Sequence, residues 1–202
     1  MKNIKSIFIS IALLITVNSV MAQDNEWALK KNKDGIEVYT RVDEESGLIE
    51  FKSTITLATN LETLLNVFND VEGYTKWMAD TKVSTVLEKI NANESYIYFE
   101  AQVPWPLENR DMPLYQKIEK TTNGIYIYLT GVEDYIPHKK RITRIENAVG
   151  YWELTQIKNN QIRVKYGFLA DPGLNIPNWI INLFIVDGPY KTLINLKEVV
   201  KN

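Results

Sequence analysis

Hydrophobic and polar residues alternate along most of the middle of the chain. In the run 96–103, Ile97, Phe99, Ala101 and Val103 alternate with tyrosine or polar residues. The same two-residue period recurs in four further runs, at 49–55, 112–118, 125–130 and 161–170. This period is typical of β-strands with one buried face. We therefore predict an antiparallel sheet whose apolar face must be covered by another element.

The C-terminal segment is the predicted cover. Pro177 suits a first helical turn, and a broad apolar stripe follows, made of Trp179, Ile180, Leu183, Phe184, Val186, Tyr190, Leu193, Ile194 and Val200. Gly188-Pro189 interrupts the stripe and predicts a kink or a break. A shorter helix is predicted after Thr59, because Thr59 and Glu62 have the spacing of a capping box.

The first 22 residues have the features of a signal peptide. Lys2 and Lys5 precede the apolar run 7–17, and Val20-Met21-Ala22 offers a cleavage site after Ala22. The alternative is an uncleaved anchor, although the apolar run is short for a span of about 20 residues. We expect export, to the periplasm or out of the cell, and a single domain over residues 23–202.

Composition limits the function of this domain. Without the two leader lysines, 21 Lys and Arg face 25 Asp and Glu, a net charge of −4, which does not favour nucleic acid as a partner. The chain has no cysteine and one histidine, His138, so we expect no disulfide, metal site or cofactor. Four serines follow the leader, none in a Gly-x-Ser-x-Gly turn. We therefore identify no catalytic residue, and we expect a monomer.

Two motifs carry a resemblance to a known family. The first is Pro104-Trp105-Pro106-Leu107-Glu108-Asn109-Arg110-Asp111, whose prolines cannot lie inside a central strand. The second is Asp171-Pro172-Gly173-Leu174-Asn175-Ile176-Pro177-Asn178-Trp179 at the start of the long helix. In this order they closely resemble motifs of the START family of lipid-binding domains. The resemblance extends from Trp27 to the C-terminus.

The resemblance implies a fold and a function. The fold is the α+β helix-grip architecture, a curved antiparallel sheet wrapped around a long C-terminal helix. The function is to bind a lipid or another apolar small molecule between sheet and helix, for lipid transfer or sensing in the cell envelope. Two alternatives remain open: a polyketide cyclase/aromatase-type enzyme on the same fold, and an interaction module whose core is filled.

Strand parity selects the candidate cavity residues. Inward positions of the sheet, with two from the helix, give Phe99, Arg110, Met112, Leu114, Gln116, Leu129, Trp152, Leu154, Val164, Tyr166, Phe168, Ile180 and Phe184. The apolar members have the composition of a packed core as well as of a cavity. Arg110 has two interpretations, a contact with a lipid headgroup or a structural ion pair with a carboxylate, because a buried charge must be satisfied.

The loop 131–141 matches in position the lid of the family, beside the C-terminal helix. Tyr135, Ile136 and His138 are its candidate lid residues, and Lys139-Lys140-Arg141 follow. Apolar residues next to basic ones are suited to transient contact with an anionic membrane surface. The alternative is an ordinary solvated loop.

Overall fold

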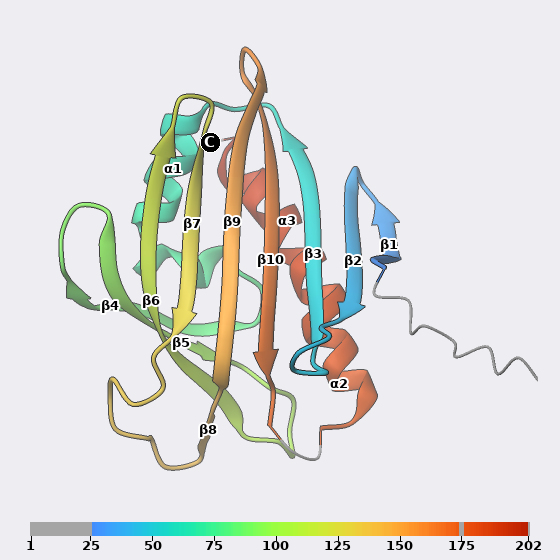
Figure 1. The fold of residues 1–202 in the computed structure, drawn as a ribbon, viewed down its shortest axis with the longest axis vertical. Coiled ribbons are helices and arrows are strands. Elements are labelled where there is room, and N and C mark those ends of the chain that lie inside the picture. Colours follow the sequence, from blue (N-terminus) through green and yellow to red (C-terminus); the bar gives the residue numbers. More distant parts are fainter. Residues whose placement is uncertain (1–25, 174–175, 202) are drawn as a thin grey trace, which may run out of the picture.

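The computed structural model describes residues 26–173 and 176–201, which form one curved sheet wrapped around the C-terminal helix (Figure 1). Nine strands pair antiparallel in the order β1-β2-β3-β10-β9-β7-β6-β5-β4, and the short β8 pairs parallel with β6. The strands are β1 (Ala28–Lys33), β2 (Ile36–Val42), β3 (Ile49–Leu57), β4 (Thr81–Lys89), β5 (Glu94–Ala101), β6 (Asn109–Thr121), β7 (Gly124–Gly131), β8 (Ile142–Arg144), β9 (Glu146–Lys158) and β10 (Gln161–Asp171). The helices are α1 (Leu61–Asn69), the 3-10 helix η1 (Glu72–Lys76), α2 (Asn178–Asn182), the π-helical η2 (Leu183–Asp187) and α3 (Gly188–Val199).

The two faces of the sheet follow the alternation in the sequence. On β3, Phe51, Ser53 and Ile55 are buried, whereas the residues between them are only partly buried. The register between β3 and β10 places Phe51 opposite Phe168 and Ser53 opposite Tyr166, so inward residues meet inward residues. The concave face of the sheet lies against the C-terminal helix (Figure 1). The predicted helix-grip fold is confirmed.

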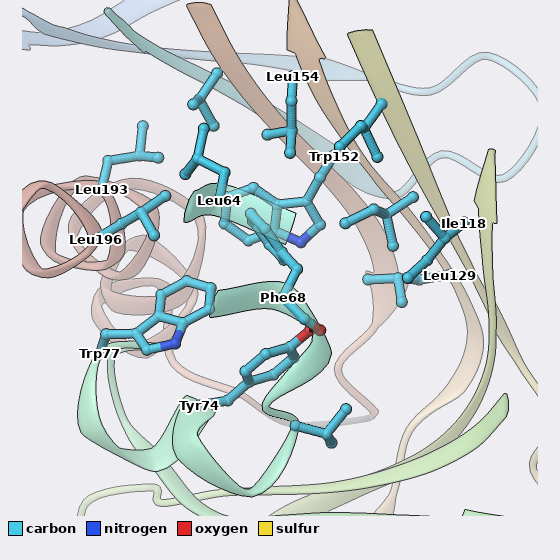
Figure 2. Packing of buried hydrophobic residues seen from close by; sticks show 14 of the residues in the cluster. Leu64, Phe68, Tyr74, Trp77, Ile118, Leu129, Trp152, Leu154, Leu193 and Leu196 are labelled. Carbon is cyan, nitrogen blue, oxygen red and sulfur yellow. Dashed lines mark hydrogen bonds between the residues drawn. The ribbon is translucent and has the colours of Figure 1, made fainter. Parts of the chain in front are cut away.

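One half of the concave face is filled by an aromatic cluster. Phe68 of α1 contacts Trp152 of β9 edge-on at 4.9 Å and Trp77 at 5.5 Å, measured between ring centroids. Figure 2 shows Leu193 and Leu196 of α3 reaching the same cluster. This half of the protein therefore has a conventional packed core.

The cap of α1 differs by one residue from the prediction. Asn60, not Thr59, is the N-cap, and its side-chain oxygen accepts a hydrogen bond of 2.9 Å from the backbone N–H of Thr63. We expect Asn60→Ala to lower the free energy of unfolding by about 1 kcal/mol, because this N–H loses its partner. Urea denaturation measures the loss. Asn66→Ala, at an exposed position within α1, is the control and should not destabilise the protein; equal losses in both variants would contradict the assignment of the cap.

The interruption predicted at Gly188-Pro189 takes the form of a π-helical stretch. Helical structure continues from α2 through η2 into α3. Proline has no N–H and its ring excludes the carbonyl four residues earlier, and the N–H of Gly188 donates to the carbonyl of Leu183, five residues back. A Cβ at position 188 would lie 3.2 Å from that carbonyl oxygen, so the close approach favours glycine.

Two strands, β1 and β8, have no alternation of apolar and polar residues in the sequence. β1 is polar and mostly exposed, and it pairs with β2 at the edge of the sheet. β8 has three residues, too few for a period to be recognised. The predicted leader 1–22 and its cleavage site at Ala22 lie outside the described residues. Within the described ranges, no helix combines the length and the apolar character needed to cross a bilayer.

Candidate functional site

A cavity of about 420 Å³ lies between the concave face of the sheet and the C-terminal helical segment. Its apolar lining from the sheet includes Phe51, Phe99, Ala101, Met112, Leu114, Leu129, Phe168 and Ala170. The C-terminal segment contributes Ile176, Ile180, Ile181, Phe184, Ile185 and Pro189. This volume is many times a water molecule's share of liquid volume, about 30 Å³, and the apolar lining is suited to an apolar ligand such as an acyl chain.

Most of the predicted cavity residues lie at this cavity. Phe99, Arg110, Met112, Leu114, Leu129, Tyr166, Phe168, Ile180 and Phe184 all line it. They come from four strands, β5, β6, β7 and β10, and from two helical segments, and the curvature of the sheet brings them together. That these residues bind a ligand stays a prediction.

Four predicted residues do not line the cavity: Gln116, Trp152, Leu154 and Val164. They have the inward parity and all four are buried. Trp152, Leu154 and Val164 belong to the packed core, where Trp152 contacts Phe68 of α1. Trp152 stacks on Tyr166 with ring centroids 3.9 Å apart and ring planes 2° apart. This stacked pair is the boundary between the packed core and the cavity.

Arg110 projects toward the cavity from the first residues of β6 and is 8 % exposed. One guanidinium nitrogen donates to the backbone carbonyl of Glu108, whereas the buried Nε has no hydrogen-bond partner among the described residues. Burial lowers the pKa of Arg110, and the negative charge of Glu108 acts in the opposite direction. The ion pair with a carboxylate, one of the two interpretations, is not formed within the described part of the chain.

Asp111, the next residue, points to the opposite face and forms a buried ion pair. Its carboxylate accepts two hydrogen bonds from Arg144 of β8, at 2.7 and 3.1 Å, and one from the hydroxyl of Tyr98 at 3.1 Å. Both charged side chains are at most 2 % exposed. Arg144 also donates to the backbone carbonyls of Glu133 and Ile136. The pair therefore fastens the loop 132–141 to β6.

None of the three predicted lid residues lines the cavity. Tyr135 stacks on Tyr96 of β5 at 4.0 Å and donates a hydrogen bond to Glu88, which places it against the outer face of the β4–β5 hairpin. This hydrogen bond raises the pKa of Tyr135 to about 12. Ile136 is partly buried and His138 is exposed. The structure thus shows the loop beside the site, with its tip fixed on the outer surface.

Two exposed tryptophans lie in the motifs that flank the cavity. Trp105, in the connection between β5 and β6, is 90 % exposed, and Trp179, in α2, is 58 % exposed. Figure 1 shows that this connection, α2 and the loop before β8 share one end of the molecule. That end therefore combines apolar aromatic surface with the basic run 139–141.

The cavity, the helix-grip fold and the two motifs all occur in one known family. The family model described as the START domain matches residues 12–198. The chain belongs to the START domain family.

Relatives cover almost the whole chain. The uncharacterized protein PA1579 of Pseudomonas aeruginosa is 29% identical over 188 residues, which cover 93% of this chain and 92% of that protein. The phosphatidylcholine transfer protein of Rattus norvegicus is 26% identical over 183 residues, 88% of this chain and 85% of the relative. The crystal structure of the STAR-related lipid transfer protein (fragment 25–204) from Xanthomonas axonopodis superimposes with a TM-score of 0.78 and 33% identity, covering 87% of this chain and 99% of that one.

This START domain has cavity residues that the sequence patterns did not reveal. Thr192 of α3 lines the cavity, and its hydroxyl oxygen accepts a hydrogen bond of 3.1 Å from the N–H of Ala79. Asp80 lines the cavity with φ near +55°, a conformation that aspartate tolerates better than most residues. The one feature of the sequence that could have indicated Asp80 is its position directly before the strand β4. The described residues contain no group of three or more side chains suited to binding a metal ion.

Proposed function

We propose that this START protein binds a lipid in the cavity and carries it between membranes of the cell envelope. The observation that carries the proposal is the apolar cavity of about 420 Å³ between the sheet and the C-terminal helix. The names of relatives support it, since one is a phosphatidylcholine transfer protein and another a STAR-related lipid transfer protein. The predicted signal peptide of residues 1–22 and export are part of this proposal.

Desolvation is the proposed physical basis of transfer. Burying one methylene group contributes about 0.8 kcal/mol, so an acyl chain in an apolar cavity dissociates slowly into water. A membrane at the cavity entrance replaces water as the receiving phase and removes that cost. No bond is made or broken in this process, and we propose that the protein is not an enzyme.

The test is native-state mass spectrometry of the protein purified from the envelope of its own host. We expect a retained mass of one lipid per chain, and a mature chain that begins at Gln23. Loss of the lipid after denaturation in organic solvent is the control for non-covalent binding. Protein that carries no lipid from the host and takes up none from vesicles would contradict the proposed function.

We further propose that the end of the molecule with Trp105 and Trp179 contacts the membrane during transfer. Tryptophan is favoured at membrane–water interfaces, and basic residues such as those of the run 139–141 are attracted to anionic lipids. Both tryptophans are exposed and flank the cavity-lining segments.

Trp105→Ser should therefore slow lipid transfer between anionic vesicles several-fold, because a large apolar anchor is lost, while the amount of bound lipid stays the same. A fluorescence-dequenching assay measures the rate, and mass spectrometry measures the bound lipid. Tyr128→Ser is the matched control, since Tyr128 is a 42 % exposed aromatic residue on the outer face of β7. Equal transfer rates in wild type and Trp105→Ser would place the contact elsewhere.

A further inference from the structure

The outer face of the sheet carries a groove of about 720 Å³, which the proposed lipid transfer does not use. Its residues come from β1, β2, β3, β10, β9 and β7 and from the turn between β1 and β2. In Figure 1, β3, β10, β9 and β7 lie in front of the C-terminal helix. Most of the lining side chains have the outward parity, so the groove and the apolar cavity lie on opposite faces of one sheet.

The sheet register aligns side chains of the groove in a row across the strands. Tyr126 of β7 is opposite Glu153 of β9, and Glu153 is opposite Lys165 of β10. Lys165 is opposite Thr54 of β3, and Thr54 is opposite Glu37 of β2. Neighbouring strands are about 4.8 Å apart, so this row is roughly 19 Å long. The groove is therefore suited to an extended chain rather than to a single small group.

Three tyrosines form one end of the groove. The rings of Tyr126 and Tyr128 are nearly parallel, with ring planes 15° apart and centroids 6.3 Å apart, and Tyr128 is 42 % exposed. Tyr151 is opposite Tyr128 and lies over Gly167, where an added Cβ would be 2.3 Å from its ring. The face of an aromatic ring carries partial negative charge and attracts C–H groups. This end is thus suited to ligand rings that present C–H groups.

The basic residues of the groove leave positive charge for a ligand. Lys165 pairs with Glu153 at 2.9 Å, whereas Lys52 and Arg163 form no ion pair with the described residues. The ammonium of Lys52 lies 4.1 Å from the ring centroid of Trp27, which holds it without neutralising its charge. Burial lowers the pKa of Lys52, and neighbouring positive charges lower it further. An anionic ligand would offset this charge.

The two carboxylates of the groove favour a ligand that also carries hydroxyl groups. Glu153 accepts hydrogen bonds from Lys165, and Glu37 accepts one of 3.0 Å from the hydroxyl of Tyr39. An ionised carboxylate has about four lone-pair sites, so both can accept further hydrogen bonds from hydroxyl groups. A nucleic acid would instead bring a phosphate at every nucleotide, which these carboxylates repel.

Flat rings with C–H faces, hydroxyl groups and negative charges occur together in acidic sugars. We propose that the groove binds an acidic polysaccharide, with sugar rings on Tyr126 and Tyr128 and the acidic groups on Lys52 and Arg163. The inference adds a second binding site to the protein, and it does not depend on the proposed lipid transfer.

The experiment measures the affinity of the wild-type protein for four probes by isothermal titration calorimetry. Hexagalacturonate is a chain of acidic sugar rings, and its methyl ester has the same rings without the charges. Hexaglutamate has the charges without the rings, and hexathymidylate has flat rings on a phosphate chain. We expect hexagalacturonate to bind about tenfold more tightly than each of the other three, as the loss of one hydrogen bond to a charged group predicts. Added salt should weaken this binding, because the groove is open to solvent.

Two variants separate the charge from the rings. Arg163→Gln should weaken the binding of hexagalacturonate about tenfold and leave that of the methyl ester unchanged, since only a charge is lost. Tyr126→Ser should weaken the binding of both at least about threefold, because a stacking ring is lost. Lys89→Gln, an exposed cation of β4, and Tyr115→Ser, a tyrosine of β6, lie outside the groove and are the matched controls. Thermal melting checks that each variant is folded.

Several outcomes would overturn the inference. Hexagalacturonate that does not bind, or that binds no more tightly than its methyl ester, would exclude an acidic polysaccharide. Equal or tighter binding of hexaglutamate would indicate a surface for acidic proteins, and equal or tighter binding of hexathymidylate a surface for nucleic acid. A dimer in analytical ultracentrifugation that dissociates in Tyr126→Ser would show that two copies of the chain cover this face. Unchanged affinity in Arg163→Gln would place the site elsewhere.

Discussion

Replacing Arg144 by methionine is expected to lower the free energy of unfolding by about 3–5 kcal/mol, the usual cost of removing one partner from a buried ion pair. The carboxylate of Asp111 would stay buried, at 1 % exposure, with only the hydroxyl of Tyr98 to satisfy it. The carbonyls of Glu133 and Ile136 would lose their donor as well. Urea denaturation followed by tryptophan fluorescence measures the change.

A double variant separates the buried charge from the packing of the side chain. Asp111→Leu combined with Arg144→Met removes both charges, and it should recover part of the lost stability, since apolar replacements of buried pairs are often neutral. Lys201→Met, which breaks the exposed pair with Glu198, is the control and should produce no measurable change. A loss in Arg144→Met as small as in Lys201→Met would show that the buried pair does not stabilise the loop.

Filling the cavity is expected to have the second large effect. Ala170 of β10 lines the cavity and is partly buried, so Ala170→Trp would place an indole where we propose that the acyl chain lies. Displacing two methylene groups already weakens lipid binding by about tenfold, and an indole displaces more. Binding of a fluorescent fatty-acyl probe should therefore fall at least this much, with little change in the urea midpoint.

The matched substitution is Leu154→Trp in the packed half of the same face. Leu154 is 0 % exposed and does not line the cavity, so the larger side chain overpacks the core and should cost about 1–3 kcal/mol of stability. Its effect on probe binding should be smaller than that of Ala170→Trp. If Ala170→Trp instead destabilises the fold and leaves probe binding intact, the acyl chain does not occupy the cavity.

The sequence by itself determined the sheet faces, the covering C-terminal helix and the family. Alternation with a period of two is a local property, so the inward positions of β3, β5 and β10 could be assigned one strand at a time. The two motifs at Pro104–Asp111 and Asp171–Trp179 then identified the fold and set the expectation of a lipid ligand. Seven of the eleven cavity residues proposed on the strands line the cavity for the same reason, as do the two proposed on the helix, Ile180 and Phe184.

Only the tertiary structure decided which inward residues border a space and which are packed. Leu154 and Phe168 share the inward parity, yet only Phe168 lines the cavity, because α1 inserts Phe68 against Trp152 on the other half of the face. The partner of Asp111 is 33 residues away, on a three-residue strand that has no periodic signal of its own. Asp80 and Arg110 line one cavity because β4 and β6 both pair with β5. Volumes and long-range pairs of this kind depend on how elements pack together, and a local pattern carries no information about them.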